Sequence, residues 1–148
     1  MGARFAFAVT HTVRGFRAGE AFLDCNLPVS WQLGDSFSLK TRMDFTAGWL
    51  GREGLDAVTS SAGPAFVLKY KDLPLTLEAG SSSGLISRHE FGSVDLGGPV
   101  QFTTHIGMSW DITRHLRAGY RYEHISNAGI YKPNPGLNLQ AFAFSYIF

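Results

Sequence analysis

Hydrophobic and polar residues alternate along much of this chain with a period of two. A period of two is that of a β-strand whose two faces meet different surroundings. In "SLKTRMDFTAGW" the alternation sets large apolar residues against Lys40, Arg42 and Asp44. One face of the predicted sheet is therefore apolar and the other strongly polar. The same alternation is found at the end of the chain, where one face carries Phe142, Phe144, Tyr146 and Phe148.

The pattern predicts eight strands, several of them close to the ~9–11 residues of a membrane-spanning strand. They lie at residues 3–13, 20–31, 38–49, 63–71, 74–80, 100–110, 115–124 and 138–148. The first, third, fifth and seventh links are predicted at 14–19, 50–62, 81–99 and 125–137, and the intervening ones at 32–37, 72–73 and 111–114.

Three links of the first set are long, whereas all links of the second set are short. This asymmetry is typical of outer-membrane barrels, which have long loops outside and short periplasmic turns. We therefore expect an all-β fold, an eight-stranded antiparallel up-and-down transmembrane β-barrel that forms a single domain over residues 1–148. Both termini would lie on the periplasmic side.

Alternation alone also fits a soluble eight-stranded barrel of the lipocalin type, which is apolar inside and polar outside. The charges favour the membrane barrel, because positive and negative side chains can pair inside a narrow lumen. Trp31, Trp49 and Trp110 lie near the ends of predicted strands, where the aromatic belts of membrane proteins occur. We therefore expect the apolar faces to contact lipid.

The composition excludes several classes of protein. A net charge of +1 without a basic tract gives no indication of nucleic-acid binding. The single cysteine, Cys25, cannot form an intrachain disulfide, and the five histidines lack the spacing of metal ligands. No apolar run approaches the ~18–20 residues of a transmembrane helix. The start "MGARFAFAVTHTV" does not have the layout of a signal peptide, so we expect an export signal to have been removed.

The segment "RYEHISNAGIYKPNPGLNLQ" carries the candidate chemistry. His124 and Ser126 share the parity of the predicted lipid-facing residues, and strand residues two apart lie roughly 6.5–7 Å from each other. An imidazole and a hydroxyl at this spacing can act as base and nucleophile. A register that pairs Tyr120 with Phe142 sets His124 opposite Asn138. The pattern alone also fits two polar residues at the membrane edge.

The stretch "HISNAGIYKPNPGLN" closely resembles the motif of the lipid A 3-O-deacylases, the PagL-type barrels of the bacterial outer membrane. The resemblance implies a serine esterase that removes the acyl chain ester-linked at position 3 of the proximal glucosamine of lipid A. Lipopolysaccharide and outer-membrane lipid are then its partners, with no metal or organic cofactor and no implied oligomeric state. By position, the resemblance makes Ser126 the nucleophile and His124 the general base, and its oxyanion-hole candidates are Asn127, Gly129 and Asn134.

Position 138 departs from the family pattern, which has an acidic residue there. Asn138 can orient an imidazole but cannot stabilise the imidazolium by charge, and loss of the acid costs serine proteases on the order of 10⁴ in turnover. Three alternatives follow: a slow deacylase, a deacylase that uses another acid such as Glu90 or Asp95, or a non-catalytic barrel with an adhesive or structural role. Glu123 has the wrong parity to serve as that acid.

Overall fold

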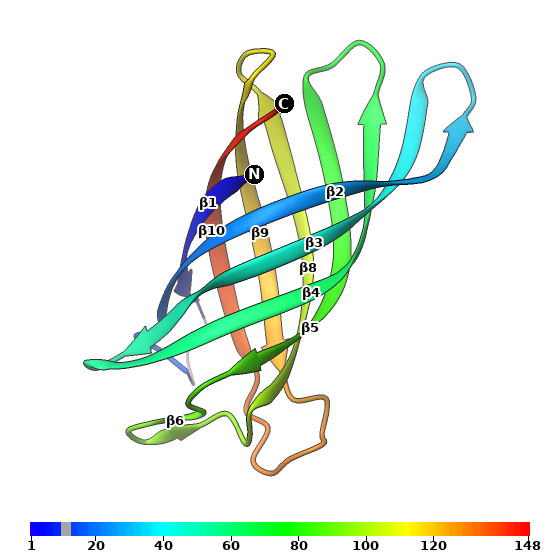
Figure 1. Ribbon diagram of the computed structural model, residues 1–148. Helices are drawn as coiled ribbons and strands as arrows, with labels where there is room; N and C mark the ends of the chain where they lie inside the picture. The colour runs from blue at the N-terminus through cyan, green and yellow to red at the C-terminus, as the bar shows by residue number, and fades with distance from the viewer. Residues whose placement is uncertain (10–12) are drawn as a thin grey trace.

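The computed structural model describes residues 1–9 and 13–148 and forms a closed antiparallel barrel with the strand order β1-β10-β9-β8-β5-β4-β3-β2 (Figure 1). The predicted eight-stranded up-and-down barrel is confirmed. In the described part of the chain, no helix is long and apolar enough to cross a membrane. The barrel strands are β1 (Gly2–Ala8), β2 (Arg17–Leu33), β3 (Phe37–Arg52), β4 (Leu55–Tyr70), β5 (Leu75–Ile86), β8 (Val100–Asp111), β9 (Leu116–Ser126) and β10 (Leu137–Tyr146), and a small hairpin pairs β6 (Glu90–Phe91) with β7 (Val94–Asp95).

The two ends of the barrel differ. The end that carries the β6–β7 hairpin and the link 127–136 is called the loop end, and the opposite end, which holds both termini, is called the terminal end (Figure 1). Links 34–36, 71–74 and 112–115 at the terminal end are short, as predicted. The chain segment 10–12, predicted to continue the first strand, lies outside the described residues.

The predicted long link at 50–62 is wrong, because β3 and β4 are joined by only two residues. Glu53 and Gly54 have φ angles of 53° and 79°. Two consecutive positive φ angles occur in the tight hairpin turns whose twist matches that of the flanking strands. The sequence did not indicate this turn, because glutamate rarely adopts a positive φ.

The expectation of a loop from residue 81 is also wrong, because β5 continues to Ile86. Ser81 and Ser83 point outward, while the luminal face of this stretch carries Ser82, Gly84 and Ile86. A Cβ atom at Gly84 would overlap the carbonyl oxygen of Ser60 on β4. Glycine is therefore required here by the close approach of two strands within the wall, whereas Gly and Ser in the sequence suggested a loop.

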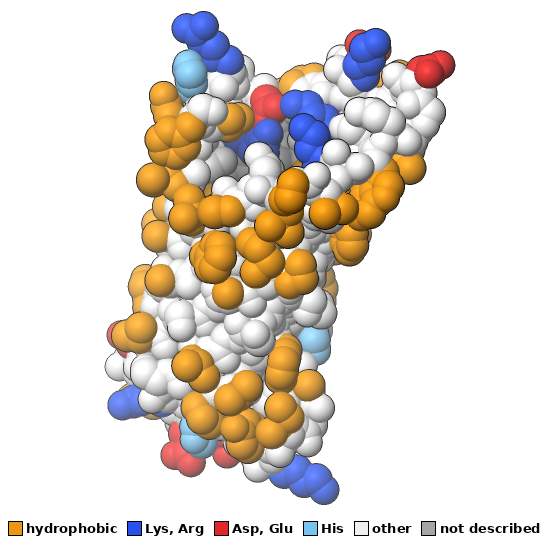
Figure 2. All heavy atoms as spheres, turned by 45° about the vertical axis from the view of Figure 1, so that its right-hand side comes forward, with side chains coloured by type: hydrophobic (Ala, Val, Ile, Leu, Met, Phe, Trp, Pro, Cys, Tyr) orange, Lys and Arg blue, Asp and Glu red, His pale blue; other side chains and the backbone are white. Residues whose placement is uncertain are grey.

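Large apolar side chains cover the outer wall. Phe5, Val58, Ile106 and Phe144 each expose more than 60 % of their surface, and Figure 2 shows hydrophobic side chains along the wall with charged ones at the two ends. A soluble monomer rarely exposes contiguous apolar surface on this scale. The wall therefore faces lipid, and the alternative of a soluble barrel is wrong.

Charged side chains fill the middle of the lumen. Arg42 donates to Glu78 at 2.9 Å and also binds Asp44, on its own strand. Arg121 from β9 donates to Glu78 at 2.6 Å and to Asp44 at 3.3 Å. These four side chains join β3, β5 and β9 across the barrel. Nearer the loop end, Arg4 donates to Glu20 and Glu123.

An apolar cluster closes the lumen at the loop end. The Phe16 and Phe91 rings pack edge to face with centroids 5.0 Å apart, so the β6–β7 hairpin covers the barrel mouth. The alternation of the sequence predicted a polar lumen throughout, and this cap differs from that expectation. The buried members of the cluster are Ala6, Val13, Phe16, Leu50, Ala57, Ile86, Phe91, Leu96, Leu137, Leu139 and Ala141.

We expect Arg121→Met to lower the free energy of unfolding by about 3–5 kcal/mol, because it removes one of the two cations that pair with the buried carboxylates of Asp44 and Glu78. The matched control is Arg117→Met. Arg117 pairs with Asp111 at the terminal end, where both side chains are only partly buried, and we expect this pair to contribute less than the luminal network, about 1 kcal/mol. Denaturant unfolding of the barrel in detergent measures both variants, and equal losses would contradict a stabilising role of the luminal network.

Candidate active site

The register of the last hairpin brings the predicted site residues together on the outer wall. Tyr120 pairs with Phe142, and His124 pairs with Asn138, as predicted. The Nδ1 atom of His124 lies 2.7 Å from the Oδ1 atom of Asn138. Because an amide oxygen only accepts hydrogen bonds, Nδ1 carries the proton and Nε2 is left as the basic nitrogen.

Ser126 ends β9 on the same face as His124 and is half-buried, opposite Phe102 of β8. Its hydroxyl forms no hydrogen bond with any residue that the structure describes, so Ser126 and His124 are not bonded to each other in this structure. Catalytic hydrogen bonds commonly form only when substrate is bound. Gly136, with a φ of 66°, lets the link 127–136 pass the imidazole, since a Cβ there would lie 3.0 Å from His124 Cε1.

Asn127 follows Ser126, points the opposite way and is fully buried. Its side-chain amide donates to the carbonyl oxygens of Leu96 at 2.9 Å and Pro133 at 3.0 Å. Its Oδ1 atom accepts from the backbone N–H groups of Gly129 and Tyr131 at 2.9 and 3.4 Å. The Asn127 side chain is thus fully used in holding the link 127–136 and in joining it to the β7–β8 link.

The three oxyanion-hole candidates are therefore not equivalent. The Asn127 amide and the Gly129 N–H already have acceptors. Asn134 accepts from the Asn127 N–H through its Oδ1 at 3.2 Å, and its NH₂ group donates to no described residue. The N–H of Ala128, which has a φ of 53°, is also unused among the described residues. The sequence could not indicate Ala128, because alanine is rarely found at positive φ.

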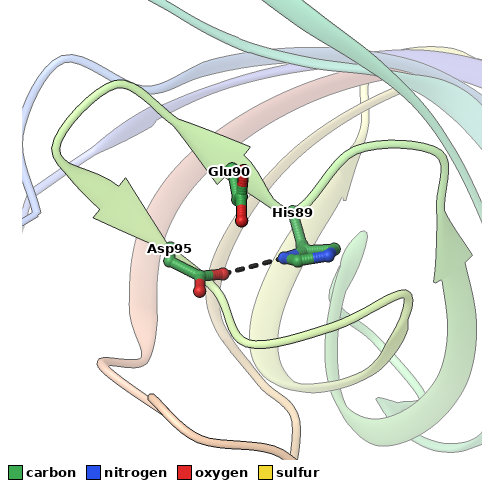
Figure 3. A group of neighbouring side chains, drawn as sticks. All are labelled: His89, Glu90 and Asp95. Atoms are coloured by element: carbon green, nitrogen blue, oxygen red, sulfur yellow. Dashed lines mark hydrogen bonds and ion pairs between the residues drawn. The ribbon is translucent and has the colours of Figure 1, made fainter.

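Neither Glu90 nor Asp95 takes the place of the missing acid. Asp95 Oδ1 lies 2.8 Å from His89 Nδ1 and accepts from the Gly97 N–H at 2.7 Å (Figure 3). These two hydrogen bonds, chiefly the one to His89, hold the pKa of the Asp95 carboxyl below its ordinary value. Among the described residues, Asn138 is the only side chain that hydrogen-bonds the His124 ring.

Two further results concern acidic groups near the site. Glu123 lies in the lumen on Arg4, as its parity predicted. His89, Glu90 and Asp95 each have a side-chain atom that could bind a metal ion, and these three atoms lie within 4.8 Å of one another (Figure 3). The sequence analysis missed this grouping. No regular spacing in the sequence marks it, because the turn between β6 and β7 brings the residues together.

We expect Asn127→Ala to release the link 127–136 while the barrel stays folded. The substitution leaves the buried Leu96 carbonyl unpaired, which costs about 1–3 kcal/mol, and it removes three partly buried hydrogen bonds within the link. Amide hydrogen exchange at Gly129 and Tyr131 should accelerate by roughly tenfold to a hundredfold. Asn26→Ala, on an exposed position near the terminal end, is the control, and unchanged exchange in Asn127→Ala would show that the amide does not hold the link.

Comparison with known proteins identifies the family of the chain. The family model described as lipid A 3-O-deacylase (PagL) matches residues 18–147. The lipid A deacylase PagL of Bordetella bronchiseptica is 40% identical over 72 residues, which span 49% of this chain and 40% of that protein. The lipid A deacylase PagL of Pseudomonas aeruginosa is 26% identical over 129 residues, 80% of this chain and 75% of that protein.

Among solved structures, the outer membrane enzyme PagL superposes on this barrel with a TM-score of 0.82 and 22% identity over the whole of both chains. That similarity supports the fold, while the match to the family model covers most of the sequence. The chain therefore belongs to the lipid A 3-O-deacylase (PagL) family.

Proposed function

We propose that this protein is an outer-membrane serine esterase that removes the ester-linked 3-O acyl chain of lipid A. The observation that carries the proposal is the position of His124: on the lipid-facing wall, bonded to Asn138 at 2.7 Å and two residues from Ser126. A substrate anchored in the membrane can reach such a site sideways. Family membership and the named activity of the two relatives support the same reaction.

In the proposed reaction Ser126 Oγ attacks the carbonyl carbon of the ester, and His124 Nε2 takes the hydroxyl proton. The Ala128 N–H and the Asn134 NH₂ group are the available donors for the oxyanion. Collapse of the tetrahedral intermediate expels the sugar 3-oxygen, which receives the proton from His124. Water, deprotonated by His124, then attacks the acyl-serine, which frees the fatty acid and restores Ser126.

Asn138 determines how well the base works in this mechanism. Its amide oxygen keeps the proton on Nδ1, so the imidazole presents Nε2 to the nucleophile. A neutral amide cannot balance the positive charge that the ring acquires. The proposed enzyme is accordingly slow, and Asn138 also supports a second candidate function, a non-catalytic outer-membrane barrel descended from such enzymes.

Ser126→Ala should abolish deacylation, with a fall of at least about 10³-fold, because alanine has no hydroxyl to attack the ester. Mass spectrometry of lipid A from cells that make the protein should show loss of one 3-hydroxyacyl chain with the wild type and none with the variant. Ser145→Ala, at the terminal end of β10, is the control. Unchanged lipid A beside folded wild-type protein in the outer membrane would contradict the proposed activity.

Asn138→Glu should raise kcat on purified lipopolysaccharide by about 10- to 10⁴-fold, because a carboxylate stabilises the imidazolium. Gln140→Glu, the next outward-facing position on β10, adds the same charge without contacting His124 and should leave kcat unchanged. A wild type without any activity that becomes active on Asn138→Glu would favour the non-catalytic barrel.

A further inference from the structure

The β7–β8 link and the link 127–136 are in direct contact beside the candidate active site. Leu96 O accepts a hydrogen bond from the Asn127 amide at 2.9 Å. Gly97 has a φ of 89°, and a Cβ atom there would overlap the carbonyl oxygen of Pro133 and the Asn127 amide. The position of Asn127, and with it the chain directly after Ser126, thus depends on where the backbone at residues 96–97 is held.

Asp95 holds that backbone. Its carboxylate accepts from the Gly97 N–H at 2.7 Å and bonds His89 Nδ1 at 2.8 Å. The Leu96 N–H in turn donates to the His89 carbonyl at 2.8 Å, so both sides of the hairpin are joined just where Leu96 meets Asn127. The carboxylate is ionised at neutral pH, since these bonds lower its pKa, and a charged acceptor makes the stronger hydrogen bond.

We propose that Asp95 is a positioning residue for the candidate active site. It acts through Gly97, Leu96 and Asn127 on the segment that follows Ser126 and carries the Ala128 N–H. Asp95 itself makes no contact with His124 and supplies no charge to it. The inference deepens the proposed function and rests on it, because a positioning role has meaning only if Ser126 reacts.

The principal test compares Asp95→Ala with Glu90→Ala. Glu90 lies on the same hairpin, and its carboxylate bonds no described residue. Glu90→Ala therefore also removes one negative charge but leaves the hydrogen bonds from Gly97 to Asp95 and from Asn127 to Leu96 in place. We expect Asp95→Ala to lower kcat on purified lipopolysaccharide by about 10- to 100-fold with KM little changed, since small displacements of catalytic groups cost rates of this size. Asp95→Asn should recover most of kcat, because its amide oxygen still accepts from Gly97.

Two measurements separate positioning from other roles. The rate at which a fluorophosphonate labels Ser126 should fall in Asp95→Ala as kcat does. Amide hydrogen exchange at Gly129, Ile130 and Tyr131, whose N–H groups all bond Asn127, should accelerate in Asp95→Ala and not in Glu90→Ala. His89→Ala leaves the hydrogen bond from Gly97 to Asp95 in place, so exchange at these amides should accelerate less than in Asp95→Ala. If Asp95→Ala does not fold, His89→Ala provides the comparison with Glu90→Ala.

The outcomes are distinct. Equal kcat, labelling and exchange in Asp95→Ala and Glu90→Ala would overturn the positioning role while the proposed function stands. A rise in KM with unchanged kcat would also overturn it, since this would place Asp95 on the substrate. A wild type that neither hydrolyses lipopolysaccharide nor reacts with the fluorophosphonate would refute the proposed function, and with it a positioning role in catalysis, even if exchange still showed the link between Asp95 and Asn127.

Discussion

Closure of the sheet in lipid is the constraint on which the rest of the structure depends. Hydrocarbon offers no hydrogen-bond partner, so each strand must bond a neighbour on both sides until the last strand meets the first. With eight strands the lumen is only wide enough for side chains. Arg42, Asp44, Glu78 and Arg121 fill its middle as paired charges, and alternate residues on each strand face the membrane.

Because of the same alternation, two adjacent residues at the end of β9 point in opposite directions and have different surroundings. Ser126 points to the lipid side beside His124, while Asn127 points inward and is fully buried. The strand ends with an outward residue that is the proposed nucleophile, and the inward residue that follows it holds two links. The barrel wall therefore orients the proposed nucleophile and base. Hydrogen bonds at the loop end hold the link 127–136, which carries the proposed oxyanion donors.

The pair formed by His124 and Asn138 shows how orientation and charge can be separated at a site. The 2.7 Å hydrogen bond fixes the ring and its tautomer, which are geometric properties that an amide supplies as well as a carboxylate. Stabilisation of the protonated ring requires a negative charge, which an amide lacks. The acids considered for that role have other partners: Glu123 pairs with Arg4 in the lumen, and Asp95 pairs with His89.

The sequence by itself determined which residues face lipid and which face the lumen, because side-chain direction in a strand follows from position parity alone. That was enough to place His124, Ser126 and Asn138 on the outer wall and Glu123 inside. Tertiary structure decided the two-residue turn at Glu53, the extension of β5 to Ile86 and the contact between Asn127 and Leu96, 31 residues apart. Each of these depends on how closely neighbouring strands and links approach once the barrel closes, and that distance is absent from any local pattern.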